Sequence, residues 1–141
     1  MSNEMLYPLE FFVAQTPMSA QNSGRSKARW KETVKSAARE RVRETDELGF
    51  LEAGPVSLTI YYFCAAPMQG DVDNLVKPIM DALIHVAYMD DRHVERAVIQ
   101  KFEPGDDWEF VKPSEGLEAA LATEPPVLYV RVDNDLLWRR L

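Results

Sequence analysis

Residues 56–65 (VSLTIYYFCA) constrain the fold more than any other stretch, because nearly every position is aliphatic, aromatic or β-branched. Such residues favour β-strands, and a run without regular polar alternation fits a strand that is covered on both faces of its sheet. The pattern therefore predicts a central strand with further elements packed on either side. Cys64, the only cysteine, lies in this run and is predicted to be a buried, inert thiol.

The segment 73–88 predicts a strongly amphipathic helix that follows this strand. Apolar residues recur with the spacing of one buried helix face, and the opposite stripe has polar residues four positions apart, namely Asp73, Lys77, Asp81 and His85. Proline is tolerated without loss of a backbone hydrogen bond only in the first turn of a helix. The regular helix is therefore expected either to begin near residues 74–76 or to bend at Pro78.

Shorter patterns predict the remaining elements. They are a first strand at residues 6–13, a helix at 26–48, strands at 94–102 and 127–132, and a short helix at 117–122. Together these elements predict an α+β fold, a single domain spanning residues 1–141 in which a mixed β-sheet of about four strands packs against two main helices. Residues 136–141 (LLWRRL) place an apolar cluster beside two arginines and fit a docking segment or an oligomer contact.

Charge is distributed unevenly along the chain. The formal net charge of −7 argues, taken alone, against a nucleic-acid partner, since neutralising phosphates requires lysine and arginine. Half of the 16 basic residues nevertheless lie between Arg25 and Arg43, where only Glu32 and Glu40 are acidic. The helix there is either a solvated face over the sheet or a phosphate-contacting surface, and the single sign of its charge favours phosphate contact. The candidate DNA-binding residues are Arg25, Lys27, Arg29, Lys31 and Lys35.

Two further segments bear on the class of protein. Residues 103–126 carry seven acidic residues against one lysine, and this stretch is expected to be a solvated excursion. The N-terminus lacks the pattern of a signal peptide, and the longest apolar run is far shorter than the ~20 residues of a membrane helix. A soluble, cytoplasmic protein without a membrane partner is therefore expected.

Three carboxylates and one lysine stand at the two ends of the amphipathic helix: Asp71, Asp73, Asp91 and Lys77. Mg²⁺ takes oxygen ligands and often needs only one or two carboxylates besides water and substrate phosphate. The pattern therefore predicts a divalent metal that acts on a phosphate. A helix over residues 73–88 rises about 24 Å, so Asp91 can meet Asp71 only if the chain returns, with residues 94–102 pairing beside the central strand.

Lys77 lies one helical turn beyond Asp73. At this position it could stabilise charge on the scissile phosphate or orient the nucleophilic water, while metal-bound carboxylates supply and activate that water. The alternative is a structural ion pair with Asp73 or Asp81, each four residues away.

Several other kinds of site are excluded. An EF-hand needs an oxygen ligand and a glycine where Leu75 and Val76 stand. The sequence has no P-loop, Gly-x-Ser-x-Gly or His-Glu-x-x-His motif. His85 and His93 are too few to build a histidine-rich metal site.

The run Asp71-Val72-Asp73-Asn74-Leu75-Val76-Lys77, followed by Asp81-Ala82-Leu83 and then Asp90-Asp91, resembles the signature of the RusA family of Holliday junction resolvases. In that family a D-x-D-N-x-x-K motif and a later D-D pair form a magnesium-dependent endonuclease site on a small homodimeric α+β protein. The resemblance implies that Asp71, Asp73 and Asp91 are metal-binding catalytic carboxylates. It further implies that Lys77 is the catalytic lysine, and that Asn74 and Asp90 support the site.

The function implied by this resemblance is a structure-selective DNA endonuclease that uses Mg²⁺, or Mn²⁺ in its place. It would resolve four-way junctions as a homodimer, because paired symmetric nicks call for two sites related by a two-fold axis. Two alternatives remain open at this point. One is another Mg²⁺-dependent phosphoryl or nucleotidyl transferase, and the other is a non-catalytic DNA-binding module of the same fold.

Overall fold

A four-stranded mixed β-sheet forms the centre of the protein in the computed structural model, which describes residues 7–18, 24–45 and 54–141. In their order across the sheet the strands are β1 (Leu9–Val13), β4 (Val127–Asp133), β2 (Val56–Phe63) and β3 (Val94–Phe102). β4 pairs antiparallel with both β1 and β2, whereas β3 runs parallel to β2. The predicted α+β fold with a mixed sheet of four strands is therefore confirmed.

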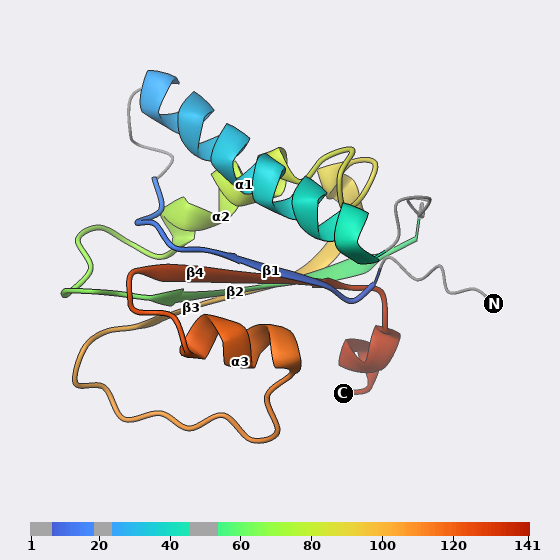
Figure 1. Ribbon diagram of the computed structural model, residues 1–141. Coiled ribbons are helices and arrows are strands. Elements are labelled where there is room, and N and C mark those ends of the chain that lie inside the picture. Colours follow the sequence, from blue (N-terminus) through green and yellow to red (C-terminus); the bar gives the residue numbers. More distant parts are fainter. Residues whose placement is uncertain (1–6, 19–23, 46–53) are drawn as a thin grey trace.

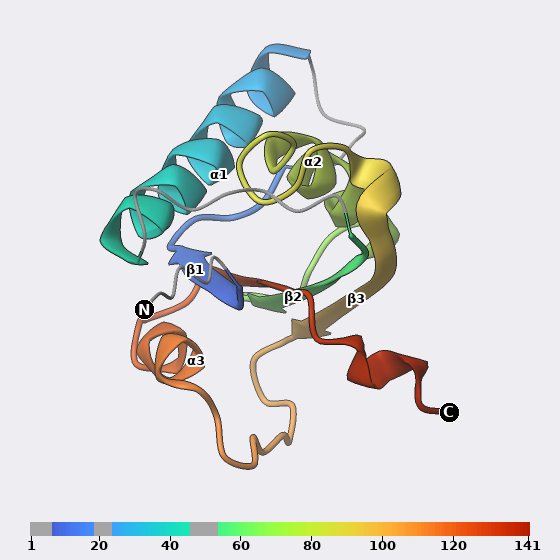
Figure 2. The ribbon, with the colours of Figure 1, turned by 90° about the vertical axis from the view of Figure 1, so that its right-hand side faces the viewer.

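β2 is the central strand that its composition predicts. It is hydrogen-bonded to β4 along one edge and to β3 along the other. Leu58 and Ile60 are fully buried, and Cys64, just beyond the strand, is a buried free thiol. Helices α1 and α2 cover one face of the sheet and helix α3 lies on the other, as Figures 1 and 2 show from two directions.

Helix α1 (Gly24–Thr45) and helix α2 (Asp73–Ala82) form the layer above the sheet in Figure 1. α1 buries Trp30, Val34 and Ala38, which are four residues apart and therefore lie along one face of the helix. This confirms the helix predicted over residues 26–48, although its last three residues lie outside the described part of the chain, as does the first residue of the predicted strand 6–13.

Helix α2 ends six residues earlier than the predicted helix 73–88, so the prediction is wrong for residues 83–88. This segment forms turns in which His85 has a φ of 68°, a left-handed conformation that a helix does not contain. The Tyr88 hydroxyl donates to the Met80 carbonyl at 2.7 Å, and Leu83 and Tyr88 are fully buried. Residues 83–88 therefore bury their apolar side chains in a compact turn, although the spacing of these side chains also fits a helix. α2 begins at Asp73 and continues through Pro78.

Helix α3 (Glu115–Leu121) covers the opposite face of the sheet, together with the loop that precedes it (Figure 1). The short helix predicted over 117–122 is confirmed with slightly earlier bounds. The acidic side chains of the loop are mostly exposed, as expected for a solvated excursion, but its aromatic residues are packed. The Trp108 ring lies 5.4 Å from that of Phe102, and the Phe110 ring lies 5.6 Å from that of Tyr61, between ring centroids. The segment therefore closes a second hydrophobic core.

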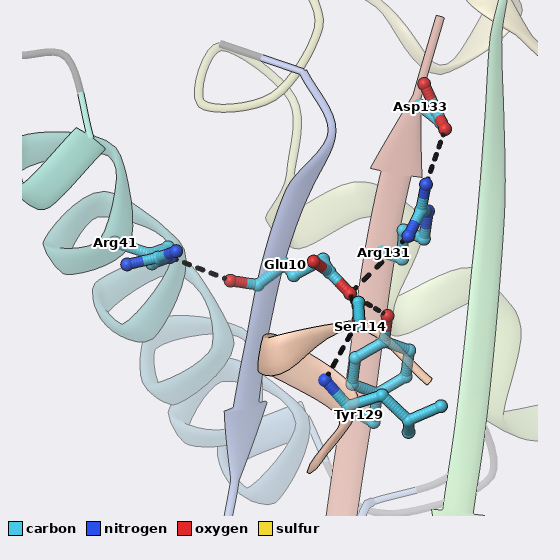
Figure 3. A network of polar contacts seen from close by, with 7 residues as sticks. Glu10, Arg41, Ser114, Tyr129, Arg131 and Asp133 are labelled. Atoms are coloured by element: carbon cyan, nitrogen blue, oxygen red, sulfur yellow. Dashed lines mark hydrogen bonds and ion pairs between the residues drawn. The ribbon is translucent and has the colours of Figure 1, made fainter. Parts of the chain in front are cut away.

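A polar network centred on Glu10 of β1 joins the two layers (Figure 3). The Glu10 carboxylate accepts hydrogen bonds from the Ser114 and Tyr129 hydroxyls and pairs with Arg131 at 3.5 Å. Ser114 also caps α3, because its Oγ accepts from the backbone N–H of Leu117 at 3.1 Å. On the other face, Nε of Arg41 in α1 donates to the Glu10 carbonyl at 3.2 Å. One residue of β1 thereby fixes both α1 and α3.

The C-terminal segment folds back onto β3. A 3-10 helix, η2 (Leu136–Arg139), brings Trp138 Nε1 and Arg139 Nε to within 2.6 and 2.7 Å of Glu95 Oε2. The hydrogen bonds from Arg139 and then Trp138 lower the pKa of Glu95 to about 2. These contacts attach Trp138 and Arg139 to β3, whereas Leu136, Leu137 and Leu141 are exposed. The role of residues 136–141 as a docking segment or an oligomer contact therefore stays a prediction. Among the described residues, no helix is long and apolar enough to cross a membrane.

Replacing Ile60 with alanine is expected to lower the free energy of unfolding by about 2–5 kcal/mol, because the side chain is fully buried in the central strand. The matched control is Val111→Ala in the exposed loop, where the side chain is 81% exposed and the expected change is within about 0.5 kcal/mol. Urea denaturation followed by circular dichroism measures both. Equal effects of the two changes would contradict a buried central position for β2.

Candidate functional site

The predicted site residues lie on the crossover from β2 through α2 to β3. Parallel strands require such a crossover, and β3 pairs with β2 from Val56↔Val94 to Phe63↔Phe102. Helix α2 therefore starts beyond the end of β2 and runs back toward the start of β3. Asp91 stands just before β3 and so returns to the side of α2. The predicted pairing of residues 94–102 beside the central strand is confirmed, whereas the meeting of Asp91 with Asp71 stays a prediction.

Asp71 and Asp73 lie where the chain enters α2. Gly70 has a φ of +86°, a conformation that favours glycine, and the Asp71 carbonyl then accepts from the backbone N–H of Asn74 at 3.2 Å. Asp71 and Asn74 line a cavity of about 330 Å³ beside Tyr62. Asp73 is exposed in the first helical turn, where the helix dipole favours a carboxylate.

Lys77 is held by two carboxylates. Its Nζ lies 2.8 Å from Oδ2 of Asp91 and 3.1 Å from Oδ1 of Asp81. These hydrogen bonds, with Asp91 the larger cause and Asp81 the next, raise the pKa of Lys77 above its ordinary value. The lysine is therefore a cation throughout the neutral range. Of the two ion pairs given as the alternative for Lys77, the one with Asp81 is present, and Asp91 is a second partner that comes from another segment of the chain.

Asp90 shapes the turn that presents Asp91. It is the N-cap of a short 3-10 helix, η1 (Asp91–His93), and its carboxylate accepts from the backbone N–H of Arg92 at 3.0 Å. This hydrogen bond lowers the pKa of the Asp90 carboxyl. Asp90 thus stays charged and caps the turn at pH values where a free aspartate begins to take up a proton.

The three predicted metal ligands are not gathered into one cluster. The described residues hold no group of three or more His, Cys, Asp or Glu side chains arranged to bind a metal ion. Asp91 faces the Lys77 ammonium, whereas Asp71 lines the cavity at the start of α2. The donor chemistry nevertheless fits Mg²⁺, because carboxylate oxygens are its usual ligands and two of them suffice beside water and phosphate. The metal role of Asp71, Asp73 and Asp91 stays a prediction.

Comparison with known families gives a match to the model of endodeoxyribonuclease RusA over residues 15–107. The chain belongs to the RusA family. This is a family of DNA endonucleases that act on Holliday junctions. The matched region includes α1, β2, α2 and β3, and with them all the predicted site residues. No curated protein matches the chain.

The basic helix of this RusA-family chain lies beside the crossover. α1 and α2 pack next to each other on the same face of the sheet (Figures 1 and 2). All five predicted DNA-binding residues are on α1, with Arg25 and Arg29 exposed and Lys27, Lys31 and Lys35 partly exposed. Lys31 Nζ reaches to 4.0 Å from Oδ2 of Asp81. The structure therefore brings the basic helix close to Lys77, while its contact with DNA stays a prediction.

Glu103 is a further residue at this end of the sheet that the sequence patterns did not single out. Its carboxylate accepts from the backbone N–H of Met68 at 2.8 Å and pairs with Lys101 at 3.0 Å. These two partners, with Met68 the larger cause, lower the pKa of Glu103. Glu103 thus fixes the loop that leads to Asp71. No local signal marks this contact, because the two residues are 35 positions apart.

Replacing Asp90 with alanine is expected to speed amide hydrogen exchange at Arg92 several-fold, since that N–H loses its acceptor. Asp90→Asn keeps an oxygen acceptor and should exchange at an intermediate rate. The matched control is Asp135→Ala, which removes the equivalent cap of η2 and should affect Leu137 instead. Exchange measured by NMR separates the two sites, and unchanged protection of Arg92 in Asp90→Ala would contradict the capping role.

Proposed function

We propose that the protein is a Mg²⁺-dependent endonuclease that resolves Holliday junctions by paired symmetric nicks. The observation that supports this most directly is the contact of Lys77 with Asp91 at 2.8 Å, which joins the two halves of the family motif across the β2–α2–β3 crossover. A lysine and carboxylates on adjacent segments are the groups that hydrolysis of a phosphodiester requires.

Each site residue has a role in this proposal. Asp71, Asp73 and Asp91 would hold the divalent ion, which would supply Lewis acidity and activate water for attack on the phosphate. Asn74, which lines the same cavity as Asp71, orients groups at the entrance of α2. Lys77 is a cation at neutral pH, as lysines ordinarily are. Its positive charge stabilises the negative charge that develops on the phosphate during cleavage.

Binding to DNA is assigned to α1 in this proposal. The net charge of −7 does not oppose it, because the acidic residues of the segment 103–126 lie mostly in the loop and helix on the opposite face of the sheet (Figure 2). The two faces therefore carry different charge, and branched DNA approaches the face with α1 and α2. A homodimer provides the two active sites for symmetric nicks, since a two-fold axis relates the opposing strands of a junction.

Cleavage of a labelled four-way junction with Mg²⁺ tests the proposal. Paired nicks are expected with Mg²⁺ and none with EDTA, and a linear duplex of the same sequence should stay intact. Asp73→Asn is expected to lower the rate by at least about a hundredfold and to keep or improve binding, since a carboxylate that repels phosphate is removed. The control Glu118→Gln changes an exposed carboxylate on α3 and should cleave normally.

A junction that is bound but never cut by the unchanged protein would overturn the proposal in favour of a non-catalytic DNA-binding module. Cleavage in the presence of EDTA would show that the reaction does not need a divalent metal ion. Loss of both binding and cleavage in Asp73→Asn would assign that residue a structural role instead.

The role of α1 has its own test in the salt dependence of junction binding. Replacing Arg25, Arg29 and Lys35 with alanine removes up to three phosphate contacts and is expected to reduce the slope of log K against log salt by up to about 3. Lys112→Ala with Arg140→Ala removes exposed positive charge elsewhere and should change the slope little. Fluorescence anisotropy of a labelled junction at several salt concentrations measures this slope for each variant. An unchanged slope in the α1 variant would make the basic helix a solvated face.

A further inference from the structure

Four alternating charges form a continuous chain from the basic helix to the site. Lys31 of α1 lies 4.0 Å from one oxygen of Asp81, and the other oxygen of Asp81 lies 3.1 Å from Lys77. Lys77 in turn lies 2.8 Å from Asp91. Asp81 is therefore the link between two helices, α1 and α2, that strand β2 separates in the sequence.

The position of Asp81 suits it to hold a lysine in place. Its side chain is 30% exposed, whereas that of Lys77 is 62% exposed. A lysine stem has four rotatable carbons and loses considerable side-chain entropy when it is held in one geometry. Asp81 stands one helical turn beyond Lys77 on the same face, so its carboxylate directs the ammonium along α2 toward Asp91 rather than into solvent. Ion pairs at this exposure contribute little to stability, so the arrangement matters for orientation.

We propose that Asp81 is a positioning residue that keeps the Lys77 ammonium at the site when Asp91 changes partner. This inference rests on the proposed function, in which Asp91 is a metal ligand. Lys77 contacts Oδ2 of Asp91, and a metal ion on this carboxylate would draw on its negative charge and repel the ammonium, so the contact of Lys77 with Asp91 weakens when the site is loaded. Asp81 is not among the predicted metal ligands, so it remains a partner of Lys77 when the ion is bound.

Lys31 connects the Asp81–Lys77 ion pair to DNA binding. It shares the Asp81 carboxylate with Lys77 while the protein is free. A backbone phosphate that binds Lys31 draws this lysine away from Asp81, and the full charge of Asp81 then acts on Lys77. Contact between α1 and the DNA backbone therefore strengthens the hold on the lysine that acts at the scissile phosphate.

The position of the ammonium can be measured without any cleavage. In protein labelled with ¹⁵N-lysine, the Lys77 ammonium signal is assigned by its loss in Lys77→Ala. In the unchanged protein the signal should remain distinct from those of free lysines when Mg²⁺ is added. In Asp81→Asn the Lys77 signal should merge with the signals of free lysines when Mg²⁺ is added. In Asp81→Glu the Lys77 signal should stay distinct. Glu118→Gln is the control and should behave as the unchanged protein.

Kinetics on the junction provide the second readout. Asp81→Asn is expected to lower the single-turnover rate about 10–100-fold with junction affinity changed less than about twofold, and Asp81→Glu should recover most of the rate. A merely structural role would instead lower the melting temperature and reduce rate and affinity together in both variants.

The two proposals fail in different ways. A Lys77 signal in Asp81→Asn that stays distinct with Mg²⁺ overturns the positioning role, whatever the cleavage rates are. Absence of cleavage by the unchanged protein overturns the proposed function, while the ammonium signal still decides whether Asp81 holds Lys77.

Discussion

The parallel pairing of β2 with β3 is the constraint on which the site depends. Because parallel neighbours need a crossover on one face of the sheet, α2 must start beyond the end of β2 and return to the start of β3. That path brings Asp91 back to the side of a helix that begins at Asp73, and the 2.8 Å contact with Lys77 follows. A site divided between two sequence segments is thus assembled by the topology of a single β-α-β unit.

Much of this arrangement could be predicted from local patterns. The continuous apolar run of β2 reflects the burial of its residues, and the basic stretch of α1 reflects the exposure or partial exposure of its charged side chains. The end of α2 could not be predicted, because Leu83 and Tyr88 fit a helical stripe but are buried in a turn around His85. The contact of Asp81 with Lys31 also could not be predicted from the sequence, since the two residues approach each other only because α1 and α2 pack together. The resemblance to the family motif names candidate site residues, but how they are grouped depends on side-chain geometry.

Net charge says little about the proposed DNA partner, because the charge is separated in space. The positive residues of α1 and the acidic segment before and within α3 occupy opposite faces of the sheet (Figure 2). Within the acidic segment, sequence composition indicated solvent, but Trp108 and Phe110 pack against Phe102 and Tyr61. The aromatic residues thus attach the acidic loop to the sheet, while the side chains of Asp106, Asp107 and Glu109 are exposed.

The strand order also bears on where this chain can be divided. The family match ends at residue 107, yet β4, which lies between β1 and β2, begins at Val127. A fragment that stopped at the end of the match would leave β1 without the neighbour to which it is paired here, and β2 would have an open edge. Unpaired strand edges promote association between chains. The segment that carries the family signature therefore lacks the strand that joins β1 to β2, and shortened versions for expression should retain residues through β4.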